Sequence, residues 1–295
     1  MIGLDVAPGA NTQVIGSVAD RDLVQRTVRD AGIEAIIHAG ALHKPDIVHH
    51  SRQEFVDVNV TGTLNLLEAA VAAGHDRFIF TSTTSLMISQ AIRDEQHSAA
   101  VWLDESSGPL EPRNIYGVTK LAAEGLCRLH FLEHGLNAIV LRTARFFPEN
   151  DDTLDDLSGP NLKANEFLYR RLTVEDAADA HIAALNQAPE IGFDTFIVSA
   201  LSPFARSDAA RLKSDAAAVV RGYFPEAEAL YAQRGWKLPT SIGRVYDATR
   251  AARRLGFTCR TDYRAVLRAL GSGADLPFAH APGYVSPKRT TEPCA

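Results

Sequence analysis

Two short stretches, RFIFTSTTS (77–85) and NIYGVTK (114–120), decide how this chain folds. The first begins with the apolar run from Phe78 to Phe80, which is typical of a buried parallel strand. Small hydroxyl residues, Thr81 to Thr84, follow at the carboxyl end of that strand. The second stretch opens a helical pattern. Because substrates approach an open α/β sheet at the carboxyl ends of its strands, we expect the two stretches to form one site.

Tyr116 and Lys120 stand four positions apart at the start of this helix, so their side chains share one helix face. A nearby ammonium favours the phenolate and lowers the pKa of a tyrosine, as a general acid/base requires. Tyr284 and Lys288 have the same spacing, but Pro287 excludes a helix there. The pattern around Tyr116 therefore predicts a proton-transfer site for a carbinol or a carbonyl.

With these motifs the chain resembles the extended short-chain dehydrogenase/reductase family, also called the NAD-dependent epimerase/dehydratase family, from Gly3 to about Leu270. The resemblance implies a catalytic triad of Thr83, Tyr116 and Lys120, in which Thr83 binds the reacting oxygen and Lys120 also holds the nicotinamide ribose. It implies a Rossmann-like, doubly wound parallel α/β sheet with a small C-terminal α/β substrate lobe. It also implies a nicotinamide cofactor that exchanges hydride with the substrate carbon.

The beginning of the chain departs from the family pattern. A predicted strand ends in Asp5, and an acidic residue at that place hydrogen-bonds the adenosine ribose and favours NAD over NADP. No G-x-G-x-x-G or G-x-x-G-x-x-G occurs in the sequence, so we expect the family's first strand and phosphate loop to be missing. Either the given start is internal to a longer protein, which we favour, or the chain is naturally shortened and impaired in cofactor binding.

The resemblance assigns cofactor contacts to several short segments. Ser17 and Val18 stand where the family usually has an acidic residue on the adenine side, which leaves a backbone contact there. Asn59, in VNVTGT, either supports the cofactor site or is a buried packing amide, and the small-residue turn after EAIIH is equally a packing turn. The expected cofactor-binding residues are Asp5, Ser17, Val18, Ala39, Gly40, Ala41, Asn59, Thr81, Tyr116 and Lys120.

Substrate contacts are expected after the later strands. Arg145 stands where nucleotide-sugar members tend to carry asparagine, and an arginine there can bind a carboxylate or phosphate with two hydrogen bonds. The segment 149–169 is short, as in the hexuronate dehydrogenase branch. We interpret Arg142 as one member of a structural ion pair. The expected substrate-binding residues are Thr83, Thr84, Asn114, Arg145 and Arg170.

The pattern predicts three regions: a truncated Rossmann-like NAD-binding domain (1–145), a substrate-binding lobe (146–280) and a flexible tail (281–295). A strand near 194–200 is expected to return to the sheet. The stretch between the strand at 77–85 and Tyr116 reads as an acidic, irregular loop in which Trp102 either faces substrate or packs.

Composition excludes several classes of protein. A net charge of −6 without a basic stripe argues against nucleic-acid binding. The sequence has no apolar run of the ~20 residues that a membrane span requires. Cys127, Cys259 and Cys294 have no metal-ligand spacing, so we expect no metal site and a reducing cytoplasm.

The sequence therefore predicts an NAD-dependent oxidoreductase that acts on a hydroxyl or ketone of a sugar or sugar acid. A nucleotide-sugar epimerase, with the same triad and a retained NAD, is the first alternative. A catalytically impaired binding or regulatory protein on the same scaffold is the second. The resemblance further implies a homodimer whose interface contains the Tyr116 helix and the helix at 51–73.

Overall fold

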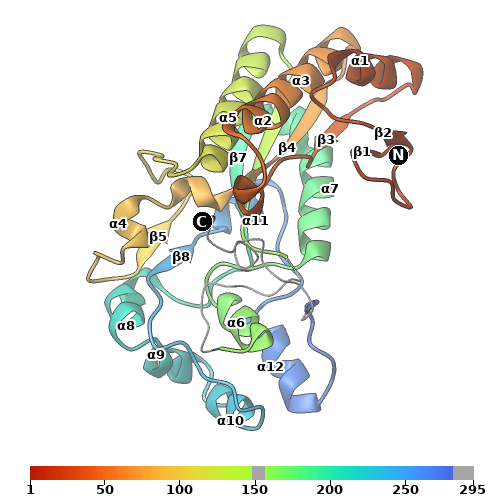
Figure 1. The fold of residues 1–295 in the computed structure, drawn as a ribbon. Coiled ribbons are helices and arrows are strands. Elements are labelled where there is room, and N and C mark those ends of the chain that lie inside the picture. The colour runs from red at the N-terminus through yellow and green to blue at the C-terminus, as the bar shows by residue number, and fades with distance from the viewer. Residues whose placement is uncertain (148–156, 282–295) are drawn as a thin grey trace, which may run out of the picture. The chain divides into compact units, whose positions relative to one another are not determined.

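The computed structural model describes residues 1–147 and 157–281 (Figure 1). These residues divide into two compact units. The first unit contains Met1–Leu86, Glu111–Arg142 and His181–Phe196, and the remaining segments form the second. This division differs from the expected boundary at residue 145, because residues 87–110 belong to the second unit and residues 181–196 to the first. The expected tail lies outside the described residues, apart from Ala281.

The parallel sheet of the first unit is built around the strand that the hydroxyl run predicts. Its strands are ordered β3-β4-β6-β7, and Ile37 of β3 pairs in parallel with Ile79 of β4. Phe78 and Phe80 are fully buried in the core on one side of this sheet. The strands are β3 (Ile36–His38), β4 (Arg77–Thr83), β6 (Asn137–Thr143) and β7 (Phe193–Val198).

A separate pair of strands lies at the start of the chain. β1 (Leu4–Asp5) and β2 (Val14–Ile15) pair in parallel as a two-stranded sheet of their own. α1 (Arg21–Asp30) follows, capped by Asp20, whose side chain accepts from the backbone N–H of Leu23 at 3.0 Å. The described strands and helices thus give the predicted parallel α/β class.

The long helix expected at 51–73 is one run with a wider turn inside it. It comprises α2 (Arg52–Val56), the π-helical turn η2 (Asp57–Thr61) and α3 (Gly62–Ala72). Ser51 and Glu54 form a reciprocal capping box at its start. At its end Gly74 has a φ of +73°, a conformation that glycine adopts without steric cost. The shorter 3-10 helix η1 (Lys44–Val48) precedes this run.

In its described part the second unit is mainly helical, with one short sheet. Its core contains Phe224, Tyr231 and Tyr263. Its elements are η3 (Thr84–Met87, which begins in the first unit), α4 (Gln90–Arg93), β5 (Val101–Leu103), α6 (Gly159–Glu166), η4 (Arg206–Asp208), α8 (Ala209–Ser214), α9 (Ala216–Tyr223), α10 (Ala227–Ala232), β8 (Arg244–Tyr246), α11 (Thr249–Arg254) and α12 (Tyr263–Ser272), while α7 (Val174–Ile191) belongs to both units.

The prediction that the stretch before Tyr116 is irregular is wrong, because it contains α4 and β5. β5 pairs in parallel with β8, and the N–H of Val101 donates to the carbonyl of Gly243 at 2.9 Å. This partner strand lies far along the chain, so no local pattern indicates it.

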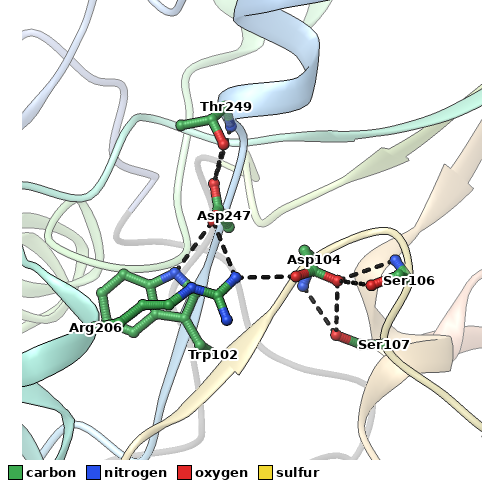
Figure 2. A network of polar contacts seen from close by, with 7 residues as sticks. All are labelled: Trp102, Asp104, Ser106, Ser107, Arg206, Asp247 and Thr249. Atoms are coloured by element: carbon green, nitrogen blue, oxygen red, sulfur yellow. Dashed lines mark hydrogen bonds and ion pairs between the residues drawn. The ribbon is translucent and has the colours of Figure 1, made fainter.

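Trp102 is held in a polar network that Figure 2 shows. Its indole Nε1 donates to Asp247 Oδ2 at 3.3 Å, and Arg206 Nη2 lies 2.9 Å from Asp104 Oδ2 and 3.4 Å from Asp247 Oδ2. The side chain also packs against the core of the second unit. Trp102 therefore has a packing role in the second unit.

Within the described ranges the helices are too short or too polar to span a bilayer. The cytoplasmic location stays a prediction.

Candidate active site

Tyr116 and Lys120 lie in the first two turns of α5 (Ile115–His134), where the sequence predicts them. Asn114 is the N-cap, and its Oδ1 accepts from the N–H of Gly117 at 3.0 Å. A Cβ on Gly117 would lie 2.8 Å from Pro112 Cβ, so this position favours glycine. The expected substrate residue Asn114 therefore has a structural task, which fixes the start of the helix that carries Tyr116.

Thr83 lies near enough to Tyr116 for its side chain to lower the pKa of the phenol. Thr83 is the last residue of β4, and its Oγ1 lies 3.1 Å from both the Oγ and the backbone N of Ser85. Tyr116 is 6% exposed and Lys120 is 2% exposed. The structure thus brings the strand-end hydroxyl to the phenol, with the lysine one helical turn further on.

Burial controls the protonation of this pair. It raises the pKa of Tyr116 to about 12, and the Thr83 side chain acts in the opposite direction. Burial likewise lowers the pKa of Lys120 to about 8, opposed by Cys127 and Glu124. The Lys120 Nζ lies 4.3 Å from the centroid of the Phe80 ring. The prediction that the pKa of Tyr116 is lowered is therefore wrong, because removal of the phenol from water raises it more than Thr83 lowers it.

Two imidazoles that the sequence analysis did not single out lie beside these groups. The ring of His43 is 5.6 Å from the ring of Tyr116, centroid to centroid. His38 is buried, and its Nε2 lies 3.0 Å from Thr63 Oγ1. Burial, followed by the charge of Lys120, lowers the pKa of His38 to about 3 and also lowers that of His43. Both rings are therefore neutral near pH 7.

The remaining expected cofactor residues also lie in the first unit. Asp5 is exposed at the end of β1, and its Oδ1 accepts from the N–H of Ala7 at 2.8 Å. Ser17 Oγ accepts from the N–H of Ala19 at 3.1 Å, and Val18 packs so close to Gly62 that a Cβ there would lie 2.5 Å from it.

The turn after β3 contains Ala39 and Gly40, which are exposed, and Ala41, which is half-buried. A Cβ on Gly40 would meet nothing closer than the His38 ring, at 3.9 Å. The turn therefore leaves backbone open to solvent. Thr81 differs, because its Oγ1 lies 2.6 Å from Nε2 of His181 on α7.

Across residues 1–147 and 157–281, the residues present fit the two ends of NAD but offer no glycine-rich turn for its pyrophosphate. The exposed carboxylate of Asp5 lies at the end of β1, where the adenosine ribose would bind. Tyr116 and Lys120 lie on α5, where the nicotinamide side would bind. Among the residues that the structure describes, no group of three or more His, Cys, Asp or Glu side chains is arranged to hold a metal ion.

Arg145 and Arg170 lie in the second unit, where they share one buried carboxylate. Glu166 has Oε1 at 2.6 Å from Arg170 and 3.5 Å from Arg145, and Oε2 at 2.8 Å from Arg171. Burial alone would raise the pKa of Glu166, but Arg170, Arg145 and Arg171 outweigh it and hold that pKa at about 2. The third arginine, Arg171, is nearly buried, whereas about a third of the Arg145 side chain is exposed.

The chain belongs to the NAD dependent epimerase/dehydratase family, whose model matches residues 3–158. Family membership and the parallel α/β fold predicted from the sequence are thereby confirmed.

Several characterised proteins are similar to parts of the chain. A uronate dehydrogenase of Pseudomonas syringae pv. tomato is 26% identical over 211 residues, which cover 68% of each chain. The L-arabinose 1-dehydrogenase (NAD(P)(+)) of Haloferax volcanii is 35% identical over 133 residues, or 44% of this chain and 50% of that protein. The low-salt glycan biosynthesis protein Agl12 of the same organism is 35% identical over 134 residues, or 45% of this chain and 40% of that protein. The chain thus matches half or less of the length of these last two relatives.

Solved structures share the fold. A UDP-glucose 4-epimerase of Thermotoga maritima, crystallised with UDP-glucose, gives a TM-score of 0.61 at 20% identity, covering 88% of this chain and 86% of that one. A short-chain dehydrogenase/reductase superfamily protein of Agrobacterium tumefaciens with bound NAD gives a TM-score of 0.61 at 22% identity. The match covers 92% of this chain and 88% of that one.

Proposed function

We propose that this protein is an NAD-dependent oxidoreductase that transfers hydride to or from a hydroxyl or ketone carbon of a sugar acid. The observation that carries the proposal is the placement of Thr83 at the end of β4 near the buried phenol of Tyr116, with Lys120 one turn later on the same helix. A hydroxyl that binds the reacting oxygen and a phenol that exchanges its proton are the two groups this reaction requires.

The protonation of Tyr116 sets the direction in which the site works. With a pKa of about 12 the phenol holds its proton near pH 7 and is ready to donate it to a carbonyl oxygen during reduction. In the oxidative direction the deprotonated phenol takes the proton of a substrate hydroxyl that Thr83 holds by a hydrogen bond. NAD, when bound, supplies the hydride acceptor or donor. Oxidation is therefore favoured by alkaline pH, which raises the deprotonated fraction of the phenol.

The first unit supplies the residues that would hold the cofactor. Asp5 would accept hydrogen bonds from the adenosine ribose, which favours NAD over NADP. The turn from Ala39 to Ala41 would offer backbone to the cofactor, and Lys120 would hold the nicotinamide ribose. Ser17 and Val18 would contribute backbone on the adenine side.

The arginines of the second unit support an anionic substrate. Arg145 and Arg170 face Glu166 together with Arg171, so the three guanidinium groups meet a single carboxylate there. Arginine recognises carboxylate and phosphate groups with paired hydrogen bonds. Among the curated relatives, two are uronate dehydrogenases, 26% and 28% identical to this chain. A hexuronate is therefore the substrate class we propose.

Exposed apolar side chains on α5 and α2 support a homodimer. Val118, Leu129 and Leu132 are 48%, 42% and 66% exposed on α5, and Val56 is 36% exposed on α2. Apolar side chains on paired helix faces are typical of subunit interfaces. Sedimentation of the native chain and of Leu132→Glu tests this, since a dimer that uses this face dissociates in the variant.

The test of the proposed function is a substrate survey with the purified chain. Hexuronates, neutral hexoses and UDP-sugars are each incubated with NAD or NADP, and NADH absorbance and products are followed. Net NADH formation from a hexuronate supports the proposal. A changed sugar epimer without net NADH indicates the epimerase, and the absence of calorimetric NAD binding together with the absence of turnover indicates the non-catalytic alternative.

A further inference from the structure

Glu124 is a buried carboxylate that joins three elements of the first unit. It lies on α5, one helical turn beyond Lys120, and is 7% exposed. Its Oε1 accepts a hydrogen bond of 2.6 Å from the hydroxyl of Ser82 on β4. Its two oxygens accept from Arg142 on β6, at 3.0 Å from Nε and 2.7 Å from Nη2. Arg142 thus forms, with Glu124, the structural ion pair that the sequence predicts for it.

The position of Glu124 relates this ion pair to the proposed triad. Ser82 immediately precedes Thr83 on β4, and Lys120 precedes Glu124 by four residues on α5. The two-point contact with Arg142 fixes the carboxylate more tightly than a single hydrogen bond would. The same carboxylate therefore anchors the strand that ends in Thr83 and the helix that carries Lys120.

A buried ion pair is a costly way to stabilise a fold, because both charges lose their hydration. Apolar side chains of similar volume often stabilise a core as well or better. Stability alone is therefore a weak reason for this pair, and its contact with the active-site strand gives a second one.

The other groups around Lys120 supply little charge. His38 and His43 have lowered pKa values and are neutral near pH 7, and burial raises the pKa of the Cys127 thiol so that it stays protonated. Asp46 acts on Tyr116 and His43. Glu124 is thus the carboxylate whose charge favours the ammonium form of Lys120.

We propose that Glu124 is a positioning residue of the active site, which fixes Thr83 through Ser82 and keeps Lys120 charged beside Tyr116. This inference rests on the proposed function for the roles of Thr83, Tyr116 and Lys120. The role has two separable parts, one geometric and one electrostatic, and each has its own variant.

The electrostatic part is tested by titrating Lys120 in Glu124→Gln. The chain is labelled with ¹³C at the lysine Cε, and the Lys120 signal is assigned with Lys120→Arg. Loss of an opposite charge nearby is expected to lower the pKa of Lys120 by about one pH unit. Glu124→Asp keeps the charge and restores the native titration. Glu133→Gln, at an exposed position of the same helix, is the control and leaves the titration unchanged.

The geometric part is tested with Ser82→Ala, which removes the hydrogen bond and keeps both charges. We expect kcat to fall by roughly ten-fold through misplacement of Thr83, with the Lys120 titration unmoved. An unchanged kcat would overturn the geometric part. In Glu124→Gln the alkaline limb of the kcat profile is expected to move to lower pH together with the Lys120 titration.

Glu124→Gln leaves Arg142 buried without its counter-charge and is prone to unfold. Glu124→Gln combined with Arg142→Met removes both charges and serves as the second variant. A native Lys120 titration in folded Glu124→Gln, or equal Lys120 titrations in the double variant and in Arg142→Met alone, overturns the electrostatic part. Because the titration needs no substrate, it remains decisive if the native chain turns over no sugar, which would defeat the proposed function instead.

Discussion

Asn59 donates a hydrogen bond of 3.0 Å to the hydroxyl of Thr119, although 60 positions separate the two residues. The same amide accepts from the N–H of Leu42 at 2.8 Å and donates to its carbonyl at 3.0 Å. Asn59 is 1% exposed and sits in the π-helical turn, a feature found frequently at functional sites. Since Thr119 directly precedes Lys120, this amide ties the segment after β3 to the active-site helix.

Asn59→Ala is expected to lower both stability and kcat. The substitution leaves backbone groups of Leu42 without a partner, at a cost of about 1–3 kcal/mol in the free energy of unfolding. Urea unfolding measures this cost. Thr119→Val removes only one of the bonds, so its effect should be the smaller. Equal free energies of unfolding for Asn59→Ala and the native chain would show that the hydrogen bonds of this amide do not stabilise the fold.

Lys120→Met is expected to be more stable than the native chain at pH 7. The pKa of Lys120 is about 8 in the folded chain and ~10.4 when unfolded, so between these values the unfolded chain binds more protons. The free energy of unfolding of the native chain therefore rises with pH through this window. Lys120→Met exceeds it by on the order of 3 kcal/mol at pH 7, and this difference shrinks as pH rises. Chemical denaturation at pH 7 and at pH 10 checks it.

Lys237→Met, at an exposed position, is the matched control and should show no such pH dependence. An advantage of Lys120→Met that is equal at both pH values would mean that the ammonium is not destabilised by burial.

Glu166→Gln is expected to destabilise the second unit strongly. It leaves Arg145, Arg170 and Arg171 without their shared counter-charge, at a cost of roughly 3–5 kcal/mol at pH 7. The pKa of Glu166 is about 2 in the folded chain, below its unfolded value. The carboxylate therefore stabilises the folded state fully above pH ~4.3, and this stabilisation is lost as pH falls towards 2.

The difference in free energy of unfolding between Glu166→Gln and the native chain should therefore become smaller at acidic pH. Glu228→Gln, which breaks the exposed ion pair with Arg221, is the control, and such pairs contribute at most ~1 kcal/mol. Unfolding curves that coincide for Glu166→Gln and the native chain at pH 7 would contradict the cluster's structural role.

Arg145→Met is expected to raise the KM for a hexuronate by about ten-fold or more, and that for the matching neutral hexose far less. A hydrogen bond to a charged group contributes about 1.5–3 kcal/mol, and ~1.4 kcal/mol corresponds to a ten-fold change in affinity. Steady-state kinetics with both sugars measure the ratio. Arg221→Met, on the exposed face of α9, should alter neither value, and an equal change for both sugars in Arg145→Met would remove Arg145 from substrate recognition.

The parts of this fold that the sequence predicts well are those that local residues determine. The spacing of Tyr116 and Lys120 predicts the start of α5, and the structure adds that Asn114 caps it and that it ends at Gly135, which has a φ of +69°. β4 follows from its apolar run and the hydroxyl residues after it.

The parts that the sequence does not predict depend on partners far along the chain. β5 exists because β8 pairs with it, and Glu124 acquires its role only when Ser82 and Arg142 are brought to it by the sheet. The direction of the Tyr116 pKa shift is of the same kind, because burial is a property of the assembled core. A spacing of four residues shows that two side chains share a face, whereas the amount of water around them is set by the rest of the fold.

The proposed reaction depends most directly on Tyr116 as the proton-transfer group. We would measure the initial rate of NADH formation from a hexuronate by the native chain and by Tyr116→Phe, which removes one oxygen from a buried ring, with Tyr223→Phe as the control. The proposed reaction predicts a loss of roughly 10²–10⁴-fold in Tyr116→Phe, native stability, and a native rate in the control. An undiminished rate in a folded Tyr116→Phe would contradict it.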